Sequence, residues 1–201
     1  KKKKNRNTTA GNNTAIGRDA MYYNTTGASN VALGYSALKD NTTGATNTAV
    51  GEGAMENNTT ASDNTAIGRK ALYTNTTGTA NVAVGETALY SNTTASNNTA
   101  VGRLALNLNT TGENNTAVGR DAGTAVTTGA GNTFLGANAG DGTDDGTNNT
   151  AVGYLALNAN CGDANTAVGE NALARSTGSA STAVGKHAGE YNTSGSNNLF
   201  F

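Results

Sequence analysis

One glycine recurs along the whole chain at almost constant spacing, and this periodicity constrains the fold more than any other feature. The glycine follows the phrase Asn-Thr-Ala-Val or a close variant, at intervals of 17 residues and twice of 16. It occurs at Gly17, Gly34, Gly51, Gly68, Gly85, Gly102, Gly119, Gly136, Gly153, Gly169 and Gly185. A unit this short cannot bury its own apolar side chains, so successive copies must stack on one another.

The repeat has constant apolar positions and variable polar ones. If the glycine is position 0, position 3 is Ala in every copy, position 15 is Ala or Phe, and position 16 is aliphatic or aromatic. Positions 1, 2, 5 and 6 vary among charged and polar residues, which is typical of an outer surface. We therefore expect the constant rows inside. The predicted core rows contain Ala20, Ala37, Ala54, Ala71, Ala88, Ala105, Val50, Val84, Val101 and Phe134.

The short apolar pairs, separated by Gly, Asn and Thr, predict strands and turns rather than helices. We expect two short strands in each repeat, over Asn-Thr-Ala-Val and x-Ala-Leu-x, with Asn-Thr-Thr-Gly as the main turn. The two shorter repeats lose their residue in this turn, around Cys161 and Ser176. The sequence thus predicts an all-β, parallel β-solenoid (β-roll) of about eleven 17-residue coils over residues 11–201, roughly 50 Å long. Residues 1–10, with Lys1 to Lys4, are expected to be a frayed or partial repeat.

A large side chain appears at position 15 where one is lost at position 4, which predicts that these two positions face each other. Position 4 is usually Leu or Met, but it is Gly at Gly123, Gly140 and Gly189. Position 15 becomes Phe134 and Phe200 in the copies that contain Gly123 and Gly189. A constant total volume is expected for one packed layer, and Phe134 is expected to serve the layer of Gly140 as well.

Neighbouring residues at positions 15 and 16 are both apolar, although neighbours in a strand point to opposite faces. Only one of these faces can fill the interior of the coil. We therefore expect the other face to be covered by another copy of the chain, in a homo-oligomer or an end-to-end fibre; the alternative is that one of the small side chains faces water.

The phrases Asn13-Thr14-Ala15-Ile16-Gly17 and Asn30-Val31-Ala32-Leu33-Gly34, each followed by Ala at position 3, resemble the YadA-like head repeats of trimeric autotransporter adhesins. The phrase Gly131-Asn132-Thr133-Phe134-Leu135-Gly136 is similar to repeats of phage tail-fibre-type and bacterial surface-fibre proteins. The resemblance implies a left-handed, trimeric β-roll at a cell surface or on a virion, which attaches to a surface glycan or matrix target.

Composition argues against several function classes. The net charge of −1 offers no electrostatic case for nucleic acid, and no apolar run is long enough to insert into a membrane. His187 and Cys161 are single residues of their type, and acidic residues are scattered over variable positions. We therefore expect neither an enzyme nor a cofactor. Cys161 is expected to be an inert thiol, with a bridge between chains as the alternative.

Asp141, Thr143 and Asp145 have the spacing of the first ligands of a calcium loop. The twelfth position, where such a loop needs an acidic ligand, is Val152. The two interpretations are a weak Ca²⁺ site and a solvated turn.

Asn-x-Thr sequons fall at one position of the turn, and two interpretations apply to them as well. They are candidate glycan acceptors, or they form stacked Asn and Thr hydrogen-bond ladders. Glycans on every coil would collide at a spacing of about 4.8 Å. The residues are Asn24, Asn41, Asn75, Asn92 and Asn109.

Tyr22, Tyr73 and Tyr90 lie outside the core rows and form a candidate binding surface, unless they merely pack against neighbouring coils.

The sequence favours a structural or adhesive fibre segment that acts as a passive stalk or head. The alternative is an ice-binding solenoid that presents rows of Thr. The two Thr of Asn-Thr-Thr would point in different directions, which disfavours the alternative.

Overall fold

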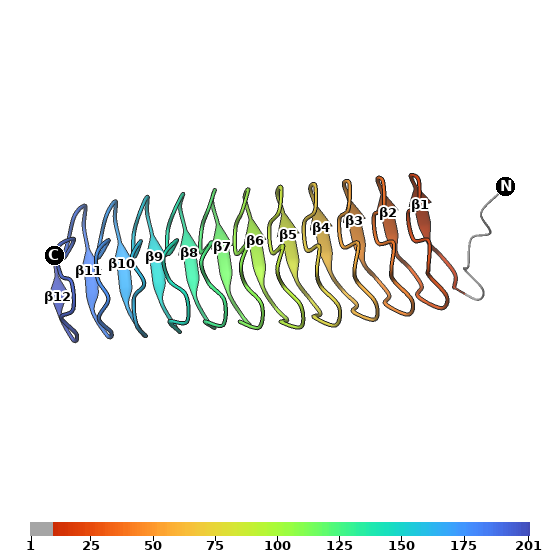
Figure 1. Ribbon diagram of the computed structural model, residues 1–201. Helices are drawn as coiled ribbons and strands as arrows, with labels where there is room; N and C mark the ends of the chain where they lie inside the picture. The colour runs from red at the N-terminus through yellow and green to blue at the C-terminus, as the bar shows by residue number, and fades with distance from the viewer. Residues whose placement is uncertain (1–9) are drawn as a thin grey trace.

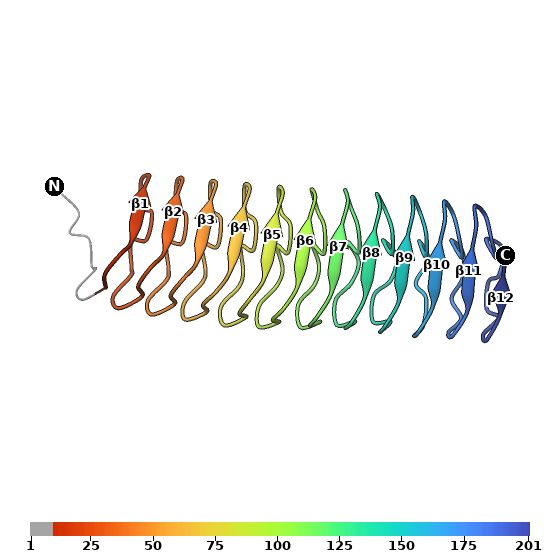
Figure 2. The same cartoon turned by 180° about the vertical axis from the view of Figure 1, so that it is seen from behind.

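The computed structural model describes residues 10–201, so the expectation for Lys1 to Lys4 lies outside the described residues. Twelve short parallel strands form one sheet in strict chain order, and the coils follow one another along a single axis (Figures 1 and 2). The strands are β1 (Thr14–Ile16), β2 (Val31–Leu33), β3 (Thr48–Val50), β4 (Thr65–Ile67), β5 (Val82–Val84), β6 (Thr99–Val101), β7 (Thr116–Val118), β8 (Thr133–Leu135), β9 (Thr150–Val152), β10 (Thr166–Val168), β11 (Thr182–Val184) and β12 (Leu199–Phe200).

The strand register follows the sequence repeat. Ala15 pairs with Ala32, and Ala32 pairs with Ala49, so each repeat of 17 residues makes one coil. The shorter repeats keep this register: Ala151 pairs with Ala167, which pairs with Ala183. The predicted parallel β-solenoid of about eleven coils is confirmed, and the deletions are absorbed in the turn.

Each coil contains one strand rather than two, and the prediction of a second strand at x-Ala-Leu-x was wrong. The backbone there adopts left-handed φ values at alternate residues, 53° at Ser36 and 51° at Leu38. An extended strand would send Ala37 and Leu38 to opposite faces, whereas the left-handed turns bury both completely. The segment is still bonded between coils, because Leu38 N–H donates to the Ala54 carbonyl at 2.9 Å.

The apolar interior consists of positions 3, 4 and 15, and this confirms most of the predicted core. Ala105 and Phe134 are fully buried, as are Ala37, Ala54, Ala71 and Ala88, while Ala20 in the first coil is partly buried. The prediction that position 16 is a buried core row was wrong. Val50, Val84 and Val101 are only half-buried, because the strand alternates and position 15 already points inward.

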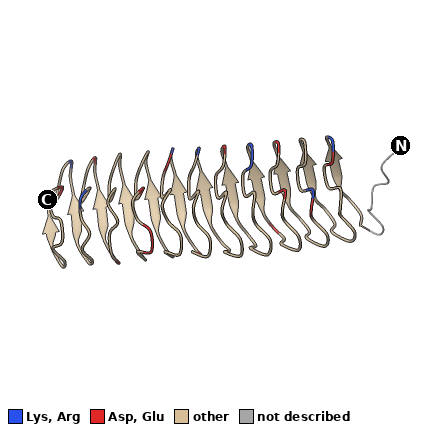
Figure 3. Cartoon of the chain, in the orientation of Figure 1, with Lys and Arg blue, Asp and Glu red and all other residues tan. Residues whose placement is uncertain are grey.

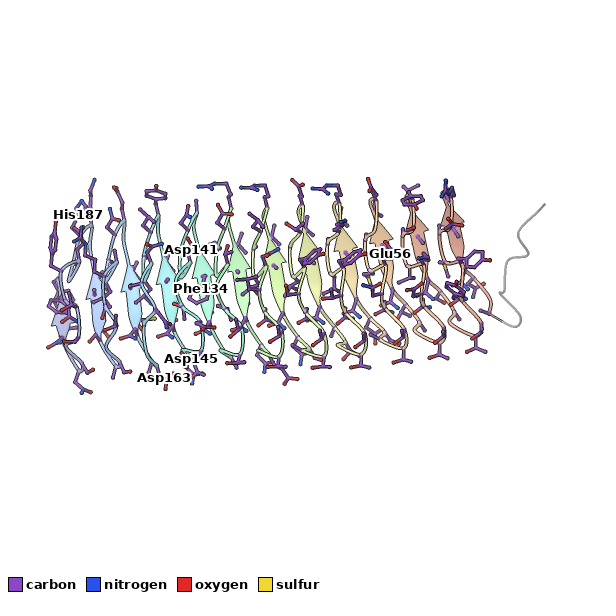
Figure 4. The ribbon with its side chains drawn as sticks, viewed as in Figure 1. Glu56, Phe134, Asp141, Asp145, Asp163 and His187 are labelled. Atoms are coloured by element: carbon purple, nitrogen blue, oxygen red, sulfur yellow. The ribbon has the colours of Figure 1, made fainter. Side chains whose placement is uncertain are left out.

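The exchange between Gly and Phe is confirmed in the packed layer. A Cβ atom at Gly123 would lie 2.7 Å from Cδ2 of Phe134, and one at Gly189 would lie 2.7 Å from Cδ2 of Phe200. A Cβ atom at Gly140 would also overlap the Phe134 ring, which lies inside the coil (Figure 4). One aromatic ring thus replaces the position-4 side chains of two successive coils.

The periodic glycine is required by close approach of the backbone. Gly136 has φ 138°, and a Cβ atom there would lie 2.7 Å from the carbonyl oxygen of Gly153 in the next coil. Any larger residue at position 0 would push neighbouring coils apart, so the spacing of the stack depends on this glycine.

Candidate functional site

The position-7 asparagines form a buried ladder along the turn. The Asn41 amide donates from Nδ2 to Asn24 Oδ1 at 2.8 Å and to the Gly44 carbonyl at 2.9 Å, and the same arrangement recurs to Asn109. Asn24, Asn41, Asn75, Asn92 and Asn109 are all fully buried. The folded coil leaves no room for a glycan on them, which corrects their interpretation as acceptors and supports the ladder interpretation.

A second ladder at position 13 was not foreseen. Asn47 N–H donates to Asn30 Oδ1 at 2.9 Å, while Asn30 Nδ2 donates to the Gly44 carbonyl at 2.8 Å. The signal was present in the sequence, since position 13 is Asn in every copy except Ser181. The two ladders satisfy the buried carbonyls of the turn, so the turns are fixed by side chains as well as by the backbone.

The position-7 ladder stops where Val126 replaces Asn. Among the described residues, Asn109 Oδ1 is the one buried side-chain oxygen or nitrogen without a hydrogen-bond partner. The next coils place Thr143 and Cys161 inside, with Thr143 Oγ1 3.3 Å from Cys161 Sγ. Burial raises the pKa of the Cys161 thiol. A buried thiol with a raised pKa is a poor nucleophile, in keeping with the expected inert thiol.

The structure does not bring together the three residues of the weak Ca²⁺ candidate, because their side chains diverge. Thr143 points into the coil, Asp145 is exposed, and Asp141 Oδ2 accepts a bond from Asn138 Nδ2 at 3.3 Å. Figure 4 shows Asp141 and Asp145 on different parts of the coil. Within residues 10–201, no three His, Cys, Asp or Glu side chains are grouped so that they could hold a metal ion. A ligand set requires converging oxygens, and the inward turn of Thr143 prevents this.

The tyrosine rings pack against each other and against neighbouring coils. Tyr73 and Tyr90 stack with ring centroids 5.2 Å apart and an interplanar angle of 2°, and Lys70 Nζ lies 5.3 Å from the Tyr73 centroid. Tyr22 and Tyr23 meet edge to face. Burial raises the pKa of the Tyr73 hydroxyl. Since neighbours occupy the ring faces of Tyr73, the packing interpretation accounts for this residue better than sugar stacking does.

Charged residues lie outside the strands (Figure 3), and several of their side chains pair between coils. Lys39 Nζ lies 3.2 Å from Glu56 Oε1, and this hydrogen bond raises the pKa of Lys39. Arg69 bonds Glu86 in the next coil and lowers the pKa of that carboxyl. His187 is exposed, and its Nδ1 lies 2.7 Å from Glu190 Oε2. These contacts are surface pairs between or within coils, and they do not converge on a cavity.

The outward side of the sheet is the most distinctive surface of the molecule. We call it the outer sheet face and define it by positions 14 and 16 of every coil. All of its residues are Thr, Val, Leu, Ile or Phe, so the strands carry no charge in Figure 3. Position 14 is Thr14, Val31, Thr48, Thr65, Val82, Thr99, Thr116, Thr133, Thr150, Thr166, Thr182 and Leu199; position 16 is Ile16, Leu33, Val50, Ile67, Val84, Val101, Val118, Leu135, Val152, Val168, Val184 and Phe201. Leu33 remains 45% exposed and Leu135 48% exposed, so apolar side chains face outward along the whole sheet.

The fold and this face define the class: a parallel β-solenoid with one uncharged, regularly repeating outer sheet face. No protein-family model, no curated protein and no solved structure matches the chain. In the described part of the chain, no helix is long and apolar enough to cross a membrane.

Proposed function

We propose that this chain is a structural segment of an extracellular or virion fibre, a passive stalk or head through which a particle or cell attaches to a surface. The observation that carries the proposal is the uniform stack: twelve strands pair in chain order, each only with its sequence neighbours. Such a stack grows in length with each repeat and keeps its cross-section, as a fibre requires.

Three sets of hydrogen bonds support a stiff rod rather than a hinged one. The strands bond through their backbones, the asparagines form the two ladders, and a row of threonines adds a third set. In this row, Thr42 Oγ1 donates to the Thr59 carbonyl at 2.9 Å, and Thr76 Oγ1 donates to the Thr93 carbonyl at 3.0 Å. Most junctions between the coils up to Asn109 are closed in a similar way, so bending there would break several bonds at once.

The variable outer positions support an adhesive role. Tyr35 and Tyr154 are about half exposed at position 1, where the fold accepts Arg, Glu, Tyr, Ala and Lys alike. Exposed tyrosines offer stacking area and a hydroxyl group, which suit a surface glycan or matrix target. The chain can vary these residues without disturbing the packed rows.

Ice binding is the second candidate function, and one observation favours it. Position 14 places Thr on nine of the twelve strands, in one row on the outer sheet face. The Thr row of the turn is less suited, because hydroxyls such as Thr42 Oγ1 are already bonded to the next coil. A thermal-hysteresis assay of the purified chain separates this function from the fibre function.

The fibre proposal is tested on the native particle and on a shortened chain. Antibodies against the chain should label projecting fibres in immunoelectron microscopy; labelling confined to the cell interior would contradict the proposal. Deletion of residues 68–101, two whole coils, should shorten the isolated rod by about 10 Å without loss of β-structure. As a matched control, deletion of residues 68–92 removes about one and a half coils and should disrupt folding, because the half coil left at the junction cannot close and pair in register with the coil before it.

A further inference from the structure

We infer that the outer sheet face is the contact surface between copies of this chain, which lie side by side with their long axes aligned. This inference deepens the fibre function and rests on it. It assigns one face of the solenoid to self-association and leaves the variable outer positions free for a target.

The first argument is exposed apolar area. Position 16 is apolar on every strand, and Leu33, Ile67, Leu135 and Val184 are each more than 40% exposed. A stable interface covers roughly 800 Å² of each partner. The outer sheet face runs along all twelve strands, so its partly exposed side chains offer a long, uncharged surface that such an interface could use. Exposed apolar side chains gathered on one face mark an interaction site on a protein.

The second argument is spacing. The side chains of the face form ridges that repeat every strand, about 4.8 Å apart, along the whole sheet. A partner must match this spacing over the same length in order to interdigitate with all the ridges. Another copy of the chain has the same ridges at the same spacing. A globular partner would meet only a few of them, so a second copy is the occupant that fits the whole face.

The third argument is the placement of charge. The ion pairs of Lys39 with Glu56 and of Arg69 with Glu86 lie on other sides of the coil, and the face itself contains no ionisable residue. Covering it therefore removes no charge from water, which would be the largest cost of association. The threonine hydroxyls of position 14 can bond across the interface or turn to its rim.

The test compares the wild-type chain with Val84→Lys by sedimentation equilibrium. Val84 lies on strand β5, away from both ends of the sheet, and points outward, so lysine fits the folded coil but places an unpaired charge in the interface. We expect the wild type to sediment as a defined oligomer, whose mass counts the copies, and Val84→Lys as a single chain. Thr94→Lys is the matched control: Thr94 is exposed in the turn, and this variant should sediment like the wild type.

A conservative variant and circular dichroism separate misfolding from lost association. Val84→Thr keeps the strand-forming shape and should weaken association less than lysine does. All variants should show the same β-spectrum. A monomeric wild type, or an oligomer unaffected by Val84→Lys, would overturn the inference while leaving a monomeric rod and its fibre function intact. A monomeric wild type whose thermal hysteresis is lost in Val84→Lys would assign the face to ice instead.

Discussion

The ring of Phe134 occupies the space that a side chain at Gly140, in the following coil, would need. Position 4 has left-handed φ values whether it is Gly140, at 63°, or Leu157, at 49°. The backbone therefore accepts leucine at this position, and the ring is what excludes it.

This relationship predicts strong coupling between the two rows. Phe134→Ala should cost about 3–5 kcal/mol because it leaves a cavity next to Gly123 and Gly140. Gly140→Leu alone should destabilise through overlap with the ring. The triple variant Phe134→Ala, Gly123→Leu, Gly140→Leu rebuilds the common repeat and should recover most of the loss. Thermal midpoints measure all three, and simple additivity of the separate effects would contradict the shared layer.

Val126→Asn should stabilise the chain. The new amide would donate from Nδ2 to Asn109 Oδ1, which has no partner now, as Asn109 itself donates to Asn92. Its own oxygen could accept from the hydroxyl of Thr143 in the next coil. A net gain of about 1 kcal/mol is expected for the completed bond. Urea denaturation measures the gain, with Val126→Ala as the control that only removes apolar contact; equal losses in both variants would refute the explanation.

Two adjacent residues should respond oppositely to aspartate. Ala105 is fully buried, so Ala105→Asp places an unpaired charge inside the coil and should cost several kcal/mol, enough to prevent folding. Leu104 has φ 61°, and the same position is Asp19 and Asp121 in other coils. Leu104→Asp should be neutral or stabilising by up to about 1 kcal/mol, because aspartate tolerates the left-handed region better. Soluble yield and the thermal midpoint test the pair, and a normally folded Ala105→Asp would refute the burial of this row.

The stacked tyrosines predict a loss of stability in alkali. The pKa of Tyr73 is raised above its ordinary value of 10.0 by burial, so the folded state holds this proton more tightly than the unfolded state does. The stabilisation is fully present below pH 10.0 and is lost as the pH rises through the higher folded pKa. Tyr73→Phe cannot ionise, and its thermal midpoint should fall less between about pH 9 and 11 than that of the wild type. Parallel decline of both proteins would show that other groups govern the alkaline transition.

The sequence was most informative where a change in one row accompanied a change in another. Gly123 with Phe134 revealed a shared layer because packed interiors keep a constant volume. It could not decide whether Ala49 or Val50 faces inward, because both are apolar and strand alternation permits either. In the structure Ala49 faces inward and Val50 faces outward. The apolar rows at positions 3, 4 and 15 meet inside the coil, and a small residue at position 15 leaves room for the other two.

Residues with left-handed backbone conformations explain why the prediction of a second strand was wrong. Leu38 and Met55 have positive φ, which bulky residues seldom adopt, so a second strand was the natural prediction from their sequence context. Spacing alone likewise did not show that Thr143, in the weak Ca²⁺ candidate, turns inward. Its position is Asn in most other copies, and a polar residue that stays constant beside the variable positions 5 and 6 indicates a buried ladder.

The asparagine ladders give the rod a direction. In the bonds between successive asparagines of both rows, the donor lies in the later coil and the acceptor in the earlier one. Asn58 donates from Nδ2 to Asn41 Oδ1, and Asn64 donates from its backbone N–H to Asn47 Oδ1. The amide dipoles of the position-7 row therefore add along the axis instead of cancelling. A break between any two of these coils would leave the acceptor oxygen of this row on one surface and its amide donor on the other. The two broken surfaces are complementary, so fragments can rejoin head to tail but not head to head.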